Sequence, residues 1–341
     1  RDLRMSRGLG DVYKRQLKNL AMRKNVFYIL AYVFCLAGCN DAPSFEEEGV
    51  PQIKVSQIMF NIQMEKEVIS FPQTKSMPDN TIPEPFAPSK AEGDPELNEL
   101  CSTIEYVVFK EENGVSVFSK HKQFVYDPSD LDADFGCIYD SLPQGNYTFY
   151  FIAHNSPMAT LSESIFSFDE ISDTFYKGLP LEIGVAEEIN ESIVLDRIVS
   201  RIEFMATDPI TEAIKQFDME IEGRAIQFDI TDGGGIKATE KETVTHIFTS
   251  EEVGISNKIH SFYTFVPSLE KPITARLSAI SLNDEAIRER QVKNIIPEKN
   301  KIIRYKGRLY SRSESDDTFQ ISIYNNGKWE ETTDVELPDY E

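Results

Sequence analysis

Short segments that alternate apolar and polar residues, or that are rich in β-branched and aromatic side chains, recur along most of the chain. In the first half they occupy residues 58–62 (IMFNI), 103–109, 115–118, 124–126, 137–139 and 147–153. Because successive side chains of a strand point to opposite faces, this spacing predicts β-strands. Asn113-Gly114, between two of these segments, predicts a tight hairpin turn. We therefore expect an antiparallel β-sandwich in this half.

A second series of such segments occupies residues 193–195, 198–205, 217–221, 225–230, 244–248, 262–266, 273–282, 302–310 and 319–324. Six prolines between residues 71 and 99 predict a loop there, because proline cannot donate a hydrogen bond to a sheet. Residues 158–176 leave room for a short helix. The sequence predicts an all-β protein of two sandwich domains in series, at residues 51–180 and 181–341.

The N-terminal region has a different pattern. Arg23 and Lys24 precede an unbroken apolar run at residues 26–37, and small residues come just before Cys39. Such a sequence is typical of a secretory signal, and as a helix the run would span about 18 Å of the ~30 Å of hydrocarbon in a bilayer. Residues 22–38 therefore predict a signal peptide. Residues 1–21, which precede a second plausible start, are expected to be a non-native or mis-assigned extension.

The last residues of this run, Leu36-Ala37-Gly38-Cys39, resemble the bacterial lipobox. That resemblance implies a diacylglyceryl group on the sulfur of Cys39 and a further acyl chain, such as palmitate, on its freed amine. Several acyl chains hold a protein on a bilayer durably, because each buried CH₂ contributes about 0.8 kcal/mol. The segment at residues 39–50 is rich in acidic residues, and it resembles the signal that sends Bacteroidetes lipoproteins to the outer face of the outer membrane. A plain solvated linker is the alternative.

The charge of the chain narrows the classes of partner. It carries 35 Lys and Arg against 57 Asp and Glu, a net charge of −22. Residues 1–38 hold eight of the basic and two of the acidic side chains, so the chain from Cys39 onward has a net charge of −28. A phosphate backbone needs a basic surface, so we expect no nucleic-acid partner.

Cysteine usage leaves one pair to explain. Cys35 leaves with the signal and Cys39 is the acylation site, which leaves Cys101 and Cys137. A secreted protein reaches an oxidising compartment, where a disulfide between them could form. By closing the loop between the two cysteines, it would stabilise the folded protein by about 4 kcal/mol. Two buried free thiols are the alternative, and the sequence does not decide between them.

Candidate catalytic and metal-binding motifs are few. Asp130, Asp132 and Asp134 alternate as in a calcium loop, but Phe135 stands where that loop needs glycine. The four histidines are scattered, and no nucleophile elbow or phosphate-binding glycine loop is present. Arg197 and Arg201 are interpreted as part of a solvated strand edge. We expect no enzyme, no cofactor and no metal site.

The order of several motifs resembles that of the fimbrillin superfamily of type V pili, and most of all its lipoprotein anchor and accessory subunits. The resemblance covers residues 39–329. The motifs that carry it are the lipobox, the proline-rich segment, residues 104–109 with the Asn-Gly turn, residues 142–147 (LPQGNY) leading to 151–155 (FIAHN), residues 195–204 (LDRIVSRIEF), and residues 300–310 (NKIIRYKGRLY) followed by 319–324 and Trp329.

The resemblance implies two transthyretin-like antiparallel sandwiches of Greek-key type. In stalk subunits of this family a protease removes the first strand after a basic residue, and a donor strand of the next subunit fills the groove. In the anchor the first strand and its lipid remain. Lys75 and Lys90 follow the first strand here, and there is no Arg from residue 40 to 196. The family's usual cleavage residue is Arg, so this absence favours an anchor or accessory role.

Three functions stay open. The first is the anchor or accessory subunit of a pilus on the outer membrane, which joins other fimbrial subunits by strand addition and contributes to adhesion. The second is a polymerising stalk subunit that loses its first strand. The third is a surface lipoprotein that binds glycans, for which the single tryptophan, Trp329, offers little aromatic surface.

Overall fold

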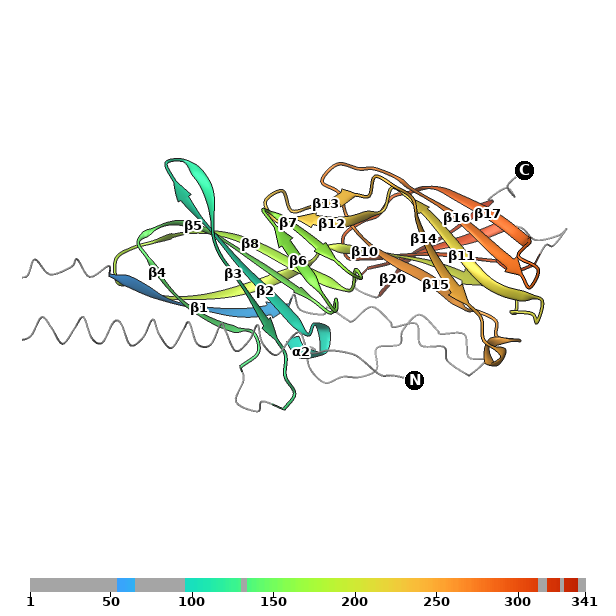
Figure 1. The fold of residues 1–341 in the computed structure, drawn as a ribbon, viewed down its shortest axis with the longest axis horizontal. Helices are drawn as coiled ribbons and strands as arrows, with labels where there is room; N and C mark the ends of the chain where they lie inside the picture. Colours follow the sequence, from blue (N-terminus) through green and yellow to red (C-terminus); the bar gives the residue numbers. More distant parts are fainter. Residues whose placement is uncertain (1–53, 65–95, 130–133, 312–317, 326–327, 337–341) are drawn as a thin grey trace, which may run out of the picture. The chain divides into compact units, whose positions relative to one another are not determined.

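Strands make up nearly all of the regular secondary structure in the residues that the computed structural model describes, which are 54–64, 96–129, 134–311, 318–325 and 328–336 (Figure 1). These ranges hold twenty strands, the short helix α2 (Leu97–Leu100) and the 3₁₀ turn η1 (Ser250–Glu252). The predicted all-β class is confirmed.

The first half of the chain contributes nine strands. They are β1 (Val55–Met64), β2 (Thr103–Glu112), β3 (Val115–Val125), β4 (Cys137–Pro143), β5 (Gly145–His154), β6 (Ala159–Ser162), β7 (Ile165–Phe168), β8 (Thr174–Ile183) and β9 (Glu188–Arg197). Seven of them form a sheet of order β3-β2-β5-β8-β9-β1-β4. The ring of Phe60 on β1 contacts the rings of Phe149 and Phe151 on β5, which is not its neighbour in the sheet. The β9-β1-β4 part therefore faces the β3-β2-β5-β8 part across a shared core.

The second half contributes eleven strands. They are β10 (Val199–Ala206), β11 (Ile214–Glu222), β12 (Ala225–Asp229), β13 (Gly234–Lys237), β14 (Glu242–Ile247), β15 (Ile259–Phe265), β16 (Ile273–Ser281), β17 (Ala286–Ile295), β18 (Lys301–Gly307), β19 (Thr318–Asn325) and β20 (Lys328–Glu336). Two sheets, β15-β10-β18-β19-β20 and β14-β11-β16-β17, pack against each other.

Two strand pairs are parallel, although the pattern predicted antiparallel sheets. In the first half β1 runs parallel to β9, and in the second half β10 runs parallel to β18. Parallel strands need a long connection, and here each pair joins a strand near the start of its half to one much further along the chain. The other ladders among the described strands are antiparallel.

Residues 158–176 contain strands where a short helix was expected. The hairpin of β6 and β7 lies in this stretch, and β8 begins at Thr174. The hairpin pairs with β12 of the second half, with Phe166 opposite Phe228, and forms the sheet β13-β12-β7-β6. A strand from a distant part of the chain completes the hydrogen bonds of β7, and no local pattern reveals such a partner.

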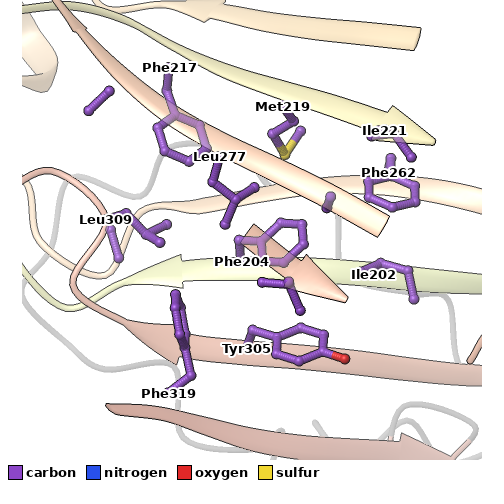
Figure 2. Close-up of a cluster of buried hydrophobic side chains, with 14 of the residues drawn as sticks. Ile202, Phe204, Phe217, Met219, Ile221, Phe262, Leu277, Tyr305, Leu309 and Phe319 are labelled. Carbon is purple, nitrogen blue, oxygen red and sulfur yellow. The ribbon is translucent and has the colours of Figure 1, made fainter. Parts of the chain in front are cut away.

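The core of the second half lies between its two sheets. Figure 2 shows side chains from both layers meeting there, with Phe217, Met219 and Leu277 on one side and Phe204 and Tyr305 on the other. Their inward positions follow the period-two spacing that identified the strands. The core extends to Leu309 and Phe319, next to the last hairpin.

A third core cluster joins the two halves. Its members are Val107, Phe109, Tyr150, Ile152, Phe166 and Ile171 from the first half, and Ile198, Val199, Ala225, Phe228, Ile230 and Phe265 from the second. All twelve are buried. The two halves therefore share apolar core as well as the β7–β12 ladder, and residues Ile53–Glu341 cluster as one unit.

Candidate functional site

Strand β1 and its two flanking strands, β4 and β9, form what we call the first-strand site. β1 is antiparallel to β4, with Val55 opposite Pro143, and parallel to β9, with Met64 opposite Leu195. Both edges of β1 are thus paired within the sheet. A strand in this position holds two neighbours together that have no ladder with each other.

The inward face of β1 is apolar and fully covered. Ile58, Phe60 and Ile62 are buried, and they alternate with more exposed residues. The Phe60 ring lies 4.9 Å from the ring of Phe149 and 5.1 Å from that of Phe151, measured between centroids. Each such side chain contributes about 1.5–3 kcal/mol on burial. Removing β1 would therefore leave an apolar groove with two unpaired strand edges.

Ser56 attaches the start of β1 to the turn between β8 and β9. Its hydroxyl donates to the carbonyl of Gly184 at 2.9 Å and accepts from the amide of Glu187 at 2.8 Å. The side chain is completely buried, so both bonds replace water. The alternation of buried positions could have placed Ser56 on the inner face, but the sequence does not show its partners.

The predicted modification and processing residues lie outside the described residues. Cys39 precedes the first described segment, and Lys75 and Lys90 fall within residues 65–95. In sequence, Lys75 and Lys90 stand between β1 and α2, so the site brings together only the strand and its two neighbours. Acylation at Cys39 and processing at either lysine remain predictions.

A buried carboxylate on the other face of the first sheet escaped the sequence analysis. Glu105 is completely buried on β2, with Oε2 at 2.6 Å from His121 Nε2 and Oε1 at 2.7 Å from Gln123 Nε2. His154 Nδ1 accepts from the amide of Ser156, which directs its Nε2 toward Glu105. Burial alone would raise the pKa of Glu105, but these hydrogen bonds outweigh it and lower the pKa to about 2. The carboxylate is ionised and held by His121, Gln123 and His154, which fits a structural role.

The interpretation of Arg197 and Arg201 as a solvated edge is wrong. Arg197 is buried and donates to Asp173 through Nε at 2.6 Å and Nη2 at 2.8 Å, and to Asn300 through Nη1 at 2.8 Å. Arg201 is buried beside Glu203, with 3.0 Å between Nε and Oε1. Arg197 is the last residue of β9, and it bonds Asp173 of the first half and Asn300 of the second, so it fixes the chain where β9 passes into β10.

Cys101 and Cys137 are both free cysteines in the structure, the first buried and the second half-buried. Cys101 is buried, and its Sγ lies 3.4 Å from the carbonyl of Leu97. Burial, assisted by Asp173, raises the pKa of Cys101 to about 12. The thiol therefore has little nucleophilic thiolate at neutral pH.

The described ranges bear on two kinds of site, a metal-binding cluster and a helix that could span a membrane. No group of three or more His, Cys, Asp or Glu there could hold a metal ion. Asp130 and Asp132 of the alternating series lie outside those ranges, and Asp134 lies within them. None of the described helices has the length and apolar character needed to cross a bilayer.

No protein-family model and no curated protein matches the chain. Solved structures do resemble it. A candidate adhesin from Bacteroides ovatus ATCC 8483 shares 11% identity, covers 76% of this chain and 87% of its own, and has a TM-score of 0.46. The fimbrial anchor protein Mfa2 from Porphyromonas gingivalis shares 13% identity over 81% of this chain and 98% of its own, with a TM-score of 0.43.

The tip fimbrial protein Mfa3 from the same organism, with a C-terminal truncation, shares 6% identity over 84% of this chain and 100% of its own, with a TM-score of 0.39. These structural neighbours are fimbrial proteins and candidate adhesins, the kind of protein that the sequence resembles.

Proposed function

We propose that the protein is a surface lipoprotein of the outer membrane that serves as an anchor or accessory subunit of a type V pilus. Acyl chains on Cys39 hold it on the membrane. It joins neighbouring fimbrial subunits by strand addition and contributes to adhesion, without enzymatic activity. The acidic residues after Cys39 and the large negative charge fit a body that stays in solvent and depends on lipid for attachment.

The observation that carries the proposal is the position of β1. It occupies the one place between β4 and β9, fills it with Ile58, Phe60 and Ile62, and is paired on both edges. In an anchor this strand stays, so the lipidated N-terminus remains connected to the folded body. The lack of Arg between residues 40 and 196 supports retention of the strand.

The test is the mass of the N-terminal peptide of the protein from native outer membranes. Digestion by a protease that cuts at acidic residues avoids creating new ends after lysine. The proposal expects a triacylated or diacylated peptide beginning at Cys39, together with peptides that run intact across Lys75 and Lys90. In a Cys39→Ser variant the acylated peptide should be lost and the protein should leave the membrane fraction.

A stalk subunit is the second candidate, because Lys75 and Lys90 lie between β1 and the rest of the fold. A cut after either lysine would separate β1 from β2. This candidate expects a mature N-terminus at residue 76 or 91. Finding it in assembled fibres would replace the anchor role by the stalk role.

A further inference from the structure

The outermost strand of the first sheet, β3, has an unpaired edge. It pairs with β2, from Val125 opposite Thr103 to Val115 opposite Glu112, and with no other described strand. It is eleven residues long and exposed over most of its length. An exposed edge of this length presents a row of free backbone N–H and C=O groups to a passing extended chain.

Apolar side chains are concentrated along this edge. Val115 and Val125 are each 62% exposed, Phe118 is 50% exposed and Val117 is 41% exposed. Solvent-exposed apolar side chains grouped on one element are a mark of an interaction surface. The centroid of the Phe118 ring lies 5.8 Å from that of Phe109 on β2, so this packing holds Phe118 in place at the surface.

The charge on β3 is opposite to that of the molecule. Its sequence, VSVFSKHKQFV, contains no acidic residue, in a chain of 57 Asp and Glu. Lys120 Nζ lies 2.8 Å from Asp140 Oδ1, and Lys122 Nζ lies 3.8 Å from the same oxygen. The two lysines share one carboxylate, and His121 bonds to Glu105. Of the two lysines, Lys122 lies farther from Asp140 and its side chain is 46% exposed, so it is the one within reach of an incoming anion.

The same charges oppose pairing of β3 with a second copy of itself. In an antiparallel pair centred on this strand, Lys120 of one copy would lie opposite Lys120 of the other, and like charges opposite each other are unfavourable. The bulge between Phe118 and Lys120 further interrupts a regular self-ladder. Pairing of two β3 edges is therefore disfavoured, whereas pairing with a strand of opposite charge is not.

We propose that the edge of β3 is a docking site for an extended acidic segment of a partner protein, which adds to the sheet beside β3. Carboxylates at alternate positions would meet Lys122 and its neighbours, and apolar residues between them would cover Val117 and Phe118. The added strand would pair with β3, which is not one of the three strands of the first-strand site, although Lys120 and Lys122 contact Asp140 of β4. The test of the docking site therefore stands or falls independently of the anchor proposal.

The experiment uses the folded chain from Cys39 onward, carrying Cys39→Ser, and two synthetic eleven-residue peptides. Both alternate threonine and valine with a charged residue, which is glutamate in one and lysine in the other. Fluorescence anisotropy measures binding, and hydrogen exchange measures protection of backbone amides. We expect the glutamate peptide to bind more tightly, to lose affinity as salt rises, and to protect amides of residues 115–125.

Lys122→Glu is the informative variant, and Lys177→Glu on β8 is its matched control, because their side chains are 46% and 44% exposed. Lys122→Glu should lower the affinity for the glutamate peptide about fivefold, the scale of one exposed charge pair, and should raise the affinity for the lysine peptide. Lys177→Glu should change neither. Equal binding of the two peptides, protection confined to β1, or self-association through β3 would each overturn the proposal.

Discussion

At the scale of single residues, Asp208 is the carboxylate with the most clearly defined task. It is buried and accepts from the amides of Leu309, Tyr310 and Ser311 at 2.9, 3.0 and 2.7 Å, and from the Ser311 hydroxyl at 2.8 Å. These residues follow β18 and belong to the segment that leads toward β19. Asp208 therefore fixes the chain just before the last hairpin.

Replacing Asp208 by alanine should lower the free energy of unfolding by about 3 kcal/mol, because three amides lose a charged acceptor inside the protein. Urea unfolding measures this. Asp284→Asn is the control, since Asp284 is exposed, its side chain pairs only with Lys215 among the described residues, and asparagine tolerates the positive φ of this position; it should cost less than about 1 kcal/mol. Equal losses in the two variants would contradict the role of Asp208.

His260 makes stability depend on pH. It is buried, stacks on Phe217 with 4.1 Å between ring centroids, and its Nε2 lies 2.7 Å from the Tyr310 hydroxyl. Burial, assisted by the charges of His246 and Lys258, lowers the pKa of His260 to about 3. The ordinary pKa of histidine is about 6.5, so below that pH the unfolded chain binds a proton at His260 that the folded protein does not bind.

The stability that His260 provides is therefore complete above pH 6.5 and is lost as the pH falls toward 3, by up to about 1.4 kcal/mol per pH unit. Between pH 6 and pH 5 the native chain should lose about 1 kcal/mol more than a His260→Gln variant, which has no ring to protonate. Urea unfolding at the two pH values measures both slopes. Identical slopes would show that His260 is protonated in the folded protein.

At the scale of elements, β1 is the strand whose loss should matter most. Phe60→Ala should lower the free energy of unfolding by about 3–5 kcal/mol, because it empties a slot lined by Phe149 and Phe151. Phe118→Ala on the exposed edge of β3 removes the same atoms and should cost less than about 1 kcal/mol. Thermal unfolding of the two variants, side by side, measures the difference.

The strands themselves were largely predictable, because their signal is local. Residues 198–205 and 147–153 were expected to be strands, and the structure has β10 at Val199–Ala206 and β5 at Gly145–His154. The alternation in 58–62 likewise gave the buried face of β1. Partners that are distant in sequence were not predictable. The helix expected within 158–176 is a hairpin because β12, some sixty residues later, pairs with β7.

In the candidate site, too, the features set by local spacing were predictable and those set by distant residues were not. The inner face of β1 could be derived from period-two spacing, whereas its parallel pairing with β9 depends on how the whole half folds. Arg197 looked like a surface residue because arginine is costly to bury alone. Its partners Asp173 and Asn300 stand 24 and 103 residues away, and only the fold brings them together.

At the scale of the whole molecule, the two halves should unfold together. The shared apolar cluster, the β7–β12 ladder and the hydrogen bond from Arg197 to Asn300 all cross between them. Calorimetry of residues 39–341 should give one transition. Asp173→Ala should lower the free energy of unfolding by about 3–5 kcal/mol, and the midpoint with it, because Arg197 then stays buried without its carboxylate.

The matched control is Asp196→Ala, which removes an exposed carboxylate that pairs with Lys177 and should leave the midpoint nearly unchanged. A double variant, Asp173→Leu with Arg197→Met, should regain most of the lost stability, since an apolar pair can replace a buried ion pair. Two separate transitions in the native chain would show that the halves are independent.

The direction of β1 also bears on how the body would resist a pull. A force applied from the N-terminal side acts along this strand, which is bonded to β9 on one edge and to β4 on the other. The strand could slip out only if the bonds of both ladders gave way almost simultaneously, as in shear, instead of opening one after another from an end. Under flow, the lifetime of such an attachment would be governed by its rate of forced unfolding more than by its equilibrium stability.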